Sequence, residues 1–551
     1  MAKSKTIGQH LIQRLEQTSL RHIFGIPGDY VLGFYDLLVA SRIEVVGTCT
    51  EIGAGFAADA YARVNGLGAV CVTYCVGGLN VLNAVAGAYA EKSPLIVISG
   101  APGLGERRRS PLLHHQVRDF NTQHQIYEKV TCASCALEDA DDAAAEIDRV
   151  IEASQRSKRP VYIELPRDMV DVPCRVTSSR TRRPSPDADD RAAMKEASSE
   201  AADMLRSARR PVILAGVEIH RFQLQERLLK LVERTGLPVA ATLLGKSVIR
   251  ENHPQYIGIY EGAMGKQSTQ RTVERADCLL ILGAFMSDIN LGVYTARLDV
   301  ARSINANSAR ISIKWHHYDD LSLARFLDEL TSRVPAATRS RKPVQKAATA
   351  PFKVRPRLAV TVQRLFDRFN EFLDENTMVI CDIGDSLFGA ADLTIHRRTE
   401  FISPAYYTSM GFAVPAAVGA QIAKRDLRPI VFVGDGAFQM TGHELATVAR
   451  LGLNPIVIVM NNKGYTTERM IHEGPYNDIH EWAYHLWPQI VRKGWGCEVR
   501  TEGELEEALT TARTNTQSFS ILNVHLDPND HSKALERLGQ RLAQRMKGSK
   551  K

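Results

Sequence analysis

Short apolar runs alternate along the chain with longer stretches that are rich in alanine or have one apolar face. In the first part of the chain, five runs rich in valine and isoleucine predict buried strands: 21–28, 43–49, 68–74, 94–100 and 160–166. Two alanine-rich stretches between them, 51–66 and 77–93, predict helices. Strands that alternate with helices in this way are typical of a parallel sheet with helices on both of its faces.

The same alternation returns twice more along the chain. Further strands are predicted at 211–219, 237–245, 278–285 and 308–315, and then at 377–386, 428–438, 454–462 and 518–526. Polar stretches at 172–189 and 334–357 indicate linkers between the groups. We therefore expect an α/β protein with three domains, each a mainly parallel sheet flanked by helices. Their expected bounds are 1–180, 190–340 and 355–551.

Composition and charge narrow the class of protein. A length of 551 residues exceeds what one hydrophobic core supports, and 44% hydrophobic with 24% charged residues is ordinary for a soluble globular protein. The net charge of +7 comes mostly from basic stretches in expected loops and linkers, without interleaved aromatic residues, which argues against nucleic-acid binding. A basic amphipathic helix is expected at 531–547, and we interpret it as packing on the third domain rather than binding a membrane.

The apolar runs and the cysteines bear on location. No apolar run reaches the length of a membrane span, and the N-terminal segment lacks the apolar core of a signal peptide, so we expect no membrane association. The nine cysteines, an odd number scattered along the chain, favour reduced thiols in a cytoplasmic protein. Cys132 and Cys135 form a C-x-x-C pair, but without a second pair they do not predict a zinc site.

The most specific chemical pattern lies in the third group of strands. Gly434, Asp435 and Gly436 end one predicted strand, and Ala437 continues into an expected helix. The free N–H groups and the dipole of a helix N-terminus can hold a phosphate group.

An oxygen-rich pattern follows at the end of the next predicted strand. Asn462 and Gly464 come directly after that strand, and they are expected beside Asp435 because ligands bind at the carboxyl ends of parallel strands. A carboxylate, an amide oxygen and a backbone carbonyl suit Mg²⁺, with phosphate oxygens in the remaining positions. The pattern therefore predicts a magnesium–phosphate site formed by these three residues.

This G-D-G…N-N pattern resembles the signature of the thiamine-diphosphate-dependent enzymes, and the resemblance extends over essentially the whole chain. It implies a pyrimidine-binding domain, a middle domain and a domain that binds the diphosphate and Mg²⁺. In that family the cofactor lies between the first domain of one subunit and the third domain of another. A homodimer is then the minimum active unit, and a homotetramer is the expected assembly. The middle domain shows no glycine-rich fingerprint for a dinucleotide, so we expect none to bind there.

The resemblance also assigns residues to the cofactor. Glu51 matches the family glutamate that hydrogen-bonds the pyrimidine ring and thereby helps the cofactor lose its ring proton. Met410 matches the apolar residue that holds the cofactor in a bent shape. The complete set implied is Glu51, Asp385, Ser386, Met410, Gly411, Gly434, Asp435, Gly436, Ala437, Asn462, Gly464 and Tyr465.

Four residues resemble those of one branch of the family, the non-oxidative 2-oxo acid decarboxylases of the indolepyruvate, phenylpyruvate and pyruvate group. They are Asp29 in "FGIPGDY", His114 and His115 in "LLHHQ", and Glu468 in "NNKGYTTE". The implied reaction releases CO₂ from a small-molecule 2-oxo acid and leaves an aldehyde. Asp29 and His115 are expected to relay protons, with His114 as an anchor behind them. Glu468 is expected beside the substrate carboxylate.

Substrate size is suggested by two positions of the expected substrate pocket. Thr467 stands where pyruvate-specific relatives carry isoleucine, and Leu387 stands where some carry tryptophan, so a wider pocket is expected. Phe388 is assigned to the same pocket. Such differences contribute roughly 1–3 kcal/mol to discrimination between substrates. They favour an aryl or bulky substrate such as phenylpyruvate or indolepyruvate over pyruvate.

Two other functions remain open from the sequence. A carboligase on the same scaffold would yield an acyloin or an acetohydroxy acid. A cofactor-binding subunit without catalytic activity is the second alternative, although the five expected catalytic residues, Asp29, Glu51, His114, His115 and Glu468, are all present.

Overall fold

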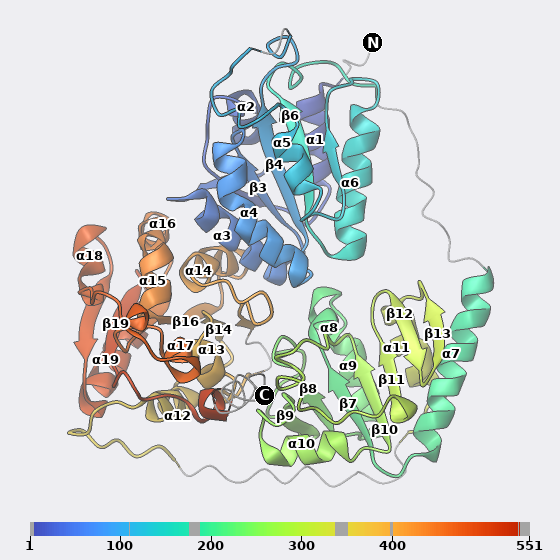
Figure 1. Ribbon diagram of the computed structural model, residues 1–551, viewed down its shortest axis with the longest axis vertical. Helices are drawn as coiled ribbons and strands as arrows, with labels where there is room; N and C mark the ends of the chain where they lie inside the picture. The colour runs from blue at the N-terminus through green and yellow to red at the C-terminus, as the bar shows by residue number, and fades with distance from the viewer. Residues whose placement is uncertain are drawn as a thin grey trace.

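The computed structural model describes residues 5–108, 111–175, 188–336, 351–396, 400–537 and 539. Within them, three sheets each lie between helices, as Figure 1 shows, which confirms the expected α/β architecture. Most of both expected linkers lies outside the described residues. The expected C-terminal helix is described only as far as a short helical stretch at 533–537 and residue 539. Among the described helices, none is both long and apolar enough to cross a bilayer.

The first sheet is parallel throughout, with the order β2-β1-β3-β4-β6-β5. Its strands are β1 (His22–Gly25), β2 (Glu44–Gly47), β3 (Gly68–Val72), β4 (Leu95–Ala101), β5 (Ser134–Ala136) and β6 (Val161–Pro166). Its helices are α1 (Ile7–Glu16), α2 (Leu32–Val39), α3 (Glu51–Asn65), α4 (Val76–Ala90), α5 (Thr122–Tyr127) and α6 (Ala143–Ser157). The strand order reverses between β1 and β3, and such a switch point is where open α/β sheets bind ligands.

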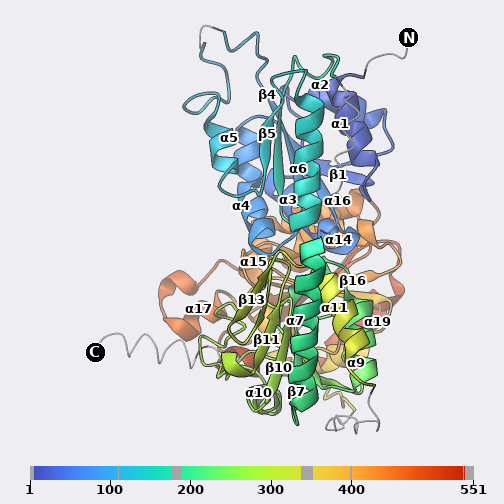
Figure 2. The same ribbon diagram turned by 90° about the vertical axis from the view of Figure 1, so that its right-hand side faces the viewer.

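The middle sheet has the order β13-β12-β11-β10-β7-β8-β9, and only its β11-β12-β13 edge is antiparallel. Its strands are β7 (Pro211–Ala215), β8 (Val239–Ala241), β9 (Tyr256–Ile259), β10 (Cys278–Leu282), β11 (Ser303–Ala306), β12 (Arg310–Ile313) and β13 (His316–Asp319). Its helices are α7 (Ala188–Ser207), α8 (Val217–Arg221), α9 (Gln225–Thr235), α10 (Gln267–Glu274), α11 (Leu323–Arg333) and the 3₁₀ turn η1 (Val300–Arg302). Figure 2 shows α7 running along this sheet.

The third sheet is parallel, with the order β15-β14-β16-β17-β19-β18. Its strands are β14 (Thr377–Cys381), β15 (Phe401–Ile402), β16 (Arg428–Gly434), β17 (Ile456–Asn461), β18 (Trp495–Val499) and β19 (Ser520–His525). Its helices are α12 (Val362–Phe372), α13 (Asp385–Ala390), α14 (Ala413–Ala423), α15 (Asp435–Thr441), α16 (Leu445–Arg450), α17 (Thr466–Ile471), α18 (Trp487–Ile490) and α19 (Glu502–Thr514). Short 3₁₀ turns are η2 (Gly442–Glu444), η3 (Pro475–Asn477) and η4 (Tyr484–Leu486). The switch point lies between β14 and β16.

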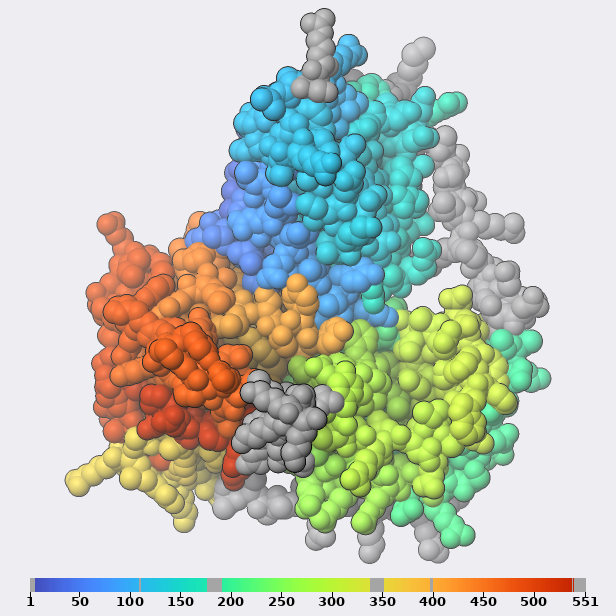
Figure 3. Space-filling model, viewed as in Figure 1, coloured from blue at the N-terminus to red at the C-terminus, as the bar shows by residue number. Residues whose placement is uncertain are grey.

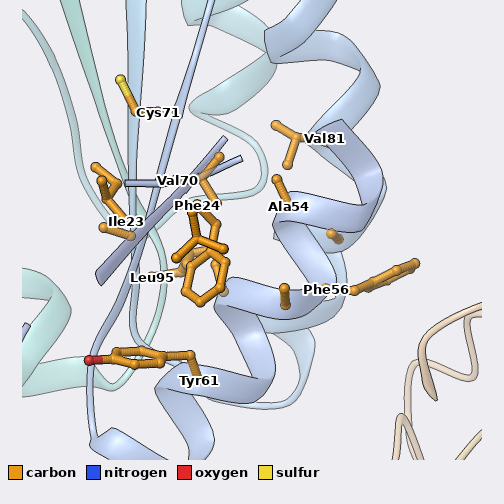
Figure 4. Close-up of a cluster of buried hydrophobic side chains, with 14 of the residues drawn as sticks. Ile23, Phe24, Ala54, Phe56, Tyr61, Val70, Cys71, Val81 and Leu95 are labelled. Atoms are coloured by element: carbon orange, nitrogen blue, oxygen red, sulfur yellow. The ribbon is translucent and has the colours of Figure 1, made fainter. Parts of the chain in front are cut away.

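The first and third domains share one hydrophobic core, which α3 and α14 join. Figure 4 shows side chains of β1 and β3 facing α3, whose Ala54 faces Val81 of α4. On another side of α3, Phe56 meets Phe412 with ring centroids 5.6 Å apart. Because the two domains share this apolar core, we expect a rigid contact between them rather than a hinge. In the space-filling view the first domain sits across the other two (Figure 3).

Candidate active site

A cavity of about 190 Å³ opens at the carboxyl end of the third sheet. We call it the third-domain cavity. It lies where β14, β16 and β17 end, at the switch point of the sheet. Its lining consists of 383–386, Thr408, Met410, 434–437, Met460, Asn462 and 464–468.

Asp435 stands at the point where β16 ends and α15 begins, and it is 1% exposed. Its carboxylate accepts hydrogen bonds from the N–H groups of Gly436 at 2.8 Å and Gly464 at 3.2 Å. Burial raises the pKa of Asp435 to about 6, although these N–H groups oppose the rise. A nearby cation would favour the ionised carboxylate and so relieve the penalty of burial.

Asn462 follows the adjacent strand, β17, and completes an oxygen pair with Asp435. Its Nδ2 donates to Thr466 Oγ1 at 2.6 Å, which turns Oδ1 away from that helix. Among the described residues, this buried Oδ1 has no hydrogen-bond partner. A buried amide oxygen without a partner beside a buried carboxylate fits a hard divalent cation such as Mg²⁺.

Glycines around these residues keep room for the backbone to approach a ligand. At Gly464 the φ angle is 153°, and a Cβ atom there would lie 2.1 Å from the carbonyl oxygen of Asn477. At Gly436 a Cβ atom would lie 2.5 Å from the ring of Tyr465, which also lines the cavity. At Gly434 a Cβ atom would meet nothing within 4 Å, so the entrance to α15 is open. The N–H groups that start α15, at Gly436 and Ala437, are therefore placed to hold a diphosphate.

Asp385 and Ser386 line the cavity at the start of α13, as expected, but Asp385 has a second connection. Its carboxylate accepts hydrogen bonds from the backbone N–H of Ser532, at 2.8 Å, and from the Ser532 hydroxyl. Burial raises the pKa of Asp385 to about 6. Asp385 therefore ties the cavity wall to the helical stretch that begins at 533.

Leu387 and Phe388 are not among the described residues that line the third-domain cavity of one chain, and their assignment to the substrate pocket stays a prediction. Leu387 is fully buried in the hydrophobic core of the third domain, and Phe388 packs with Met264 and Leu535. Both follow the cavity-lining residues Asp385 and Ser386 directly in α13, and the helix turns their side chains toward the protein interior. Thr467 does line the cavity, so the argument for a wide pocket rests on it alone.

Met410 lines the cavity, and a residue that sequence reasoning missed holds the segment after it. Asp382, fully buried at the end of β14, accepts from the N–H groups of Gly411 at 3.1 Å and Ala413 at 2.8 Å. Gly411 has a φ angle of 84°, in the left-handed region that glycine adopts readily. Burial raises the pKa of Asp382 to about 6. The sequence feature that could have identified Asp382 is its position directly after a buried strand.

A second group of polar residues lies in the first domain, and we call Asp29, His114 and His115 the histidine cluster. His114 Nε2 lies 2.7 Å from Asp29 Oδ2, and His115 Nε2 lies 3.9 Å from Asp29 Oδ1. His115 has a φ angle of 68°, an uncommon left-handed conformation. This backbone turn lets two neighbouring side chains reach one carboxylate.

Tyr30 holds His114 from its other side. The Tyr30 ring stacks on the His114 ring with centroids 4.8 Å apart, and its hydroxyl lies 3.4 Å from His114 Nδ1. Both ring nitrogens of His114 therefore have partners within the protein. His115 lies against the edges of the Tyr30 and His114 rings, and the division between an anchoring His114 and a substrate-facing His115 stays a prediction.

Arg167 is a further member of this neighbourhood that sequence reasoning missed. It follows β6 directly, and its Nη1 lies 3.7 Å from Asp29 Oδ2. Its guanidinium group lies 5.0 Å from the centre of the Tyr30 ring and pairs with Glu106. The hydrogen bond from Arg167 lowers the pKa of Glu106 below its usual range. The sequence feature that could have identified Arg167 is its position as a charged residue at the carboxyl end of a buried strand.

Glu51 begins α3, where Thr50 caps the helix by accepting from the N–H of Gly53. Asn80 of α4 donates to Glu51 Oε2 at 2.7 Å. Glu468 lies in the third domain, on α17, and it lines the third-domain cavity. The structure thus places Asp29, Glu51, His114 and His115 in the first domain and Glu468 in the third, and it joins only Asp29, His114 and His115 in one cluster. The cavity lining contains no residue of the first domain among those the structure describes.

Comparison with protein families finds three consecutive matches to the thiamine pyrophosphate enzymes. The N-terminal TPP binding domain matches residues 5–126, the central domain matches 198–333, and the C-terminal TPP binding domain matches 382–524. The order agrees with the three sheets of the structure, and the third match contains the whole lining of the cavity.

Several curated proteins resemble the chain over nearly its full length. Indole-3-pyruvate decarboxylase of Azospirillum brasilense is 36% identical, with 97% of this chain and 98% of that protein covered. Alpha-keto-acid decarboxylase of Mycolicibacterium paratuberculosis is 35% identical, with 95% and 94% covered. Pyruvate decarboxylase 1 of Pisum sativum is 33% identical, with 98% and 93% covered.

These matches confirm the resemblance on which the expectations rested, and the donors of the third-domain cavity fit the cofactor that the family uses. The enzyme is a carboxy-lyase with thiamine diphosphate as its cofactor, and Mg²⁺ is the usual partner metal in such enzymes. The chain belongs to the thiamine-diphosphate-dependent 2-oxo acid decarboxylases.

Proposed function

We propose that the preferred substrate is an aryl or otherwise bulky 2-oxo acid, of the phenylpyruvate or indolepyruvate type, which the enzyme converts to an aldehyde and CO₂. The observation that carries this proposal is the position of Thr467, a small side chain on the cavity wall directly beside Glu468. A larger residue at this position would reduce the space beside the reacting groups. The named relatives act on both kinds of substrate, so their names do not decide between them.

Each part of the third-domain cavity has a proposed task. Asp435, the free Oδ1 of Asn462 and the backbone of Gly464 would hold Mg²⁺, and the N–H groups of Gly436 and Ala437 would hold the diphosphate. Asp385, Ser386, Met410, Gly411, Gly434 and Tyr465 would shape the rest of the cofactor site. Thiamine diphosphate, when bound, supplies the nucleophilic carbon and the electron sink for decarboxylation.

The protein's own acids and bases would move the protons. Glu51 would hold the pyrimidine ring, and His114 would fix Asp29 and His115 in place. Asp29 and His115 would exchange protons with the substrate oxygen and with the carbon that loses CO₂. Glu468 would face the substrate carboxylate from the cavity wall. Each well-placed acid or base contributes roughly 10²–10⁴ to the rate.

A second copy of the chain would complete the site. The cavity takes none of its described lining from the first domain, whereas the chemistry needs Glu51 and the histidine cluster beside it. The side chains of Asp29 and His114 are 41% and 56% exposed, so they are open to such a contact. A homodimer is therefore the proposed minimum unit, and a homotetramer is the proposed assembly.

The two-chain site can be tested by mixing two inactive variants. One carries Glu51→Gln in the first domain, and the other carries Glu468→Gln in the third. In a mixed dimer one site would carry both changes and the other neither, so random exchange of subunits should restore about a quarter of wild-type activity. No recovery, with subunit exchange verified by differently tagged chains, would place each site within one chain.

The substrate is tested by measuring kcat/KM for CO₂ release with phenylpyruvate, indolepyruvate, 4-hydroxyphenylpyruvate, branched-chain 2-oxo acids and pyruvate. The aryl substrates should lead, and Thr467→Ile should shift the preference toward pyruvate by roughly 10-fold or more. Leu365→Ala is the matched control, because Leu365 of α12 is fully buried in the core outside the cavity lining and should change stability while leaving the preference unchanged. A preference of the wild-type enzyme for pyruvate would overturn the proposal. Acyloin in place of aldehyde would assign the chain to the carboligases.

A further inference from the structure

A buried carboxylate of the third domain contacts the loop that precedes Glu51. Glu444, in the turn η2, is 0% exposed. Its Oε1 accepts hydrogen bonds from the backbone N–H of Cys49 at 3.1 Å, from the backbone N–H of Thr50 at 3.1 Å and from the Thr50 hydroxyl at 3.2 Å. One oxygen of one domain therefore holds two consecutive residues of the other.

The second carboxylate oxygen of Glu444 also contacts both domains. Oε2 accepts from the N–H of Cys49 at 3.2 Å and from the hydroxyl of Thr447, in its own domain, at 2.6 Å. A Cβ atom at Gly53 would lie only 2.0 Å from Oε1, so the close approach requires glycine at that position of α3. An anion at a helix N-terminus is also favoured by the helix dipole.

These contacts fall immediately before the residue assigned to cofactor activation. We propose that Glu444 is the positioning residue for Glu51: it fixes the loop at 49–50 and thereby sets the direction in which Glu51 leaves the first turn of α3. This inference rests on the proposed role of Glu51. Glu444 touches neither substrate nor cofactor in this role and acts through the backbone.

The chain connectivity gives this contact a further consequence. Helix α15 begins at Asp435, in the wall of the third-domain cavity, and Glu444 follows its end by three residues. The stretch 435–444 therefore connects the cavity wall proposed to bind the cofactor with the loop at 49–50, which precedes Glu51 in the first domain. In the two-chain site, this stretch would serve the cofactor of one site at its start and the activating glutamate of the other at its end.

Glu444→Gln is the direct test. The glutamine keeps the size of the side chain and one oxygen but replaces the other oxygen with an NH₂ group, which cannot accept a hydrogen bond. Because the N–H of Cys49 contacts both oxygens of Glu444, either orientation of the amide places the NH₂ group against that N–H. The measurement is the rate at which thiamine diphosphate bound to the holoenzyme exchanges its ring C2 proton for deuterium, followed by acid quench and NMR. We expect the exchange rate and kcat to fall by about 10-fold or more, since small misplacements of a reacting group are costly. The substrate KM and the cofactor Kd should change little.

Thr447→Val is the matched control, because it removes the hydroxyl that donates to Oε2 and keeps both carboxylate oxygens as acceptors for the backbone N–H groups of Cys49 and Thr50. Its exchange rate should stay close to that of the wild type. If Glu444→Gln does not fold, as judged by circular dichroism, Thr50→Ala replaces it and should slow exchange in the same direction by a smaller factor. Wild-type exchange in a folded Glu444→Gln or Thr50→Ala holoenzyme would overturn the proposal.

Glu51→Gln separates this inference from the proposed function. If Glu51→Gln slows C2 exchange and Glu444→Gln does not, only the positioning role fails. If Glu51→Gln itself leaves exchange unchanged, the role assigned to Glu51 fails, and the positioning role fails with it.

Discussion

The third-domain cavity and the histidine cluster differ in how they are built. Asp435 and Asn462 are 1% and 6% exposed, and both lie at the ends of adjacent buried strands. In the histidine cluster, the side chains of Asp29 and His114 are 41% and 56% exposed, and His115 lies on a loop in a left-handed conformation. One site is enclosed by backbone, and the other is held by side chains at a surface.

The difference fits the tasks proposed for the two sites. A metal–diphosphate site needs oxygen atoms and N–H groups at fixed positions, which sheet ends and a helix start provide within a single chain. Proton transfer needs donors and acceptors shielded from water, because electrostatic interactions are weak in a high dielectric. The exposed cluster lacks this shielding in one chain. We therefore infer that assembly, rather than folding alone, completes its environment.

The comparison predicts opposite effects for variants of the two sites, and the largest effect on turnover should come from the histidine cluster. His115→Asn should lower kcat by roughly 10²–10⁴ while the affinity for thiamine diphosphate stays near that of the wild type. The reason is that His115 lies outside the cavity lining. Steady-state kinetics and cofactor titration by tryptophan fluorescence measure the two quantities. A loss of cofactor affinity equal to the loss of kcat would contradict the division of tasks.

Asp435→Asn should produce the reverse pattern. Removing the carboxylate that faces Asn462 should weaken binding of Mg²⁺ and thiamine diphosphate by roughly 10–100-fold or more. Part of the lost activity should return at high Mg²⁺ and cofactor concentrations, because the proton-transfer residues are untouched. Titration calorimetry with both components provides the measurement. Full activity at ordinary cofactor concentrations would exclude Asp435 as a metal ligand.

The third prediction concerns pH. Burial raises the pKa of Asp435 to about 6, and a metal binds the ionised form. The affinity for Mg²⁺ should reach its full value above pH 6, and it should fall by about 10-fold for each pH unit below 6. Asp382 and Asp385 also have pKa values raised to about 6, so the assignment depends on a control. The component due to Asp435 is the part that disappears in Asp435→Asn, and an unchanged pH dependence in that variant would point to the other two carboxylates.

The same contrast decides what could be predicted from sequence. The third-domain cavity was predictable because the strand ends that hold Asp435 and Asn462 are encoded locally, and their chemistry is specific. Asp29 and His114 are 85 residues apart in the chain, and only the family resemblance brought them together before the structure did. Their contact depends on the positions of two loops, which no local pattern contains.

Other residues show where local patterns fail. Leu387 was expected in the substrate pocket because it stands where some relatives carry tryptophan, whereas in the single chain it packs in the hydrophobic core of the third domain. Asp382 follows a strand and Glu444 follows a helix, and neither belongs to a functional pattern identified in the sequence. Their roles become visible only when the backbone groups of distant segments are seen to donate to them. Packing between segments, rather than residue type, assigns these functions.

The smallest expected effect belongs to Arg167, which lies beside the histidine cluster without a counterpart in the cavity. Its guanidinium group lies 3.7 Å from Asp29 Oδ2, but the side chain is 40% exposed and solvent weakens the attraction. Arg167→Met should lower kcat/KM by about 10-fold at most, and Arg167→Lys should restore part of the loss. Asp168→Asn is the control, because Asp168 holds the N–H groups of Leu104 and Gly105 at the base of the same loop without touching Asp29. If Asp168→Asn lowers kcat/KM as far as Arg167→Met, loop position rather than charge governs the cluster.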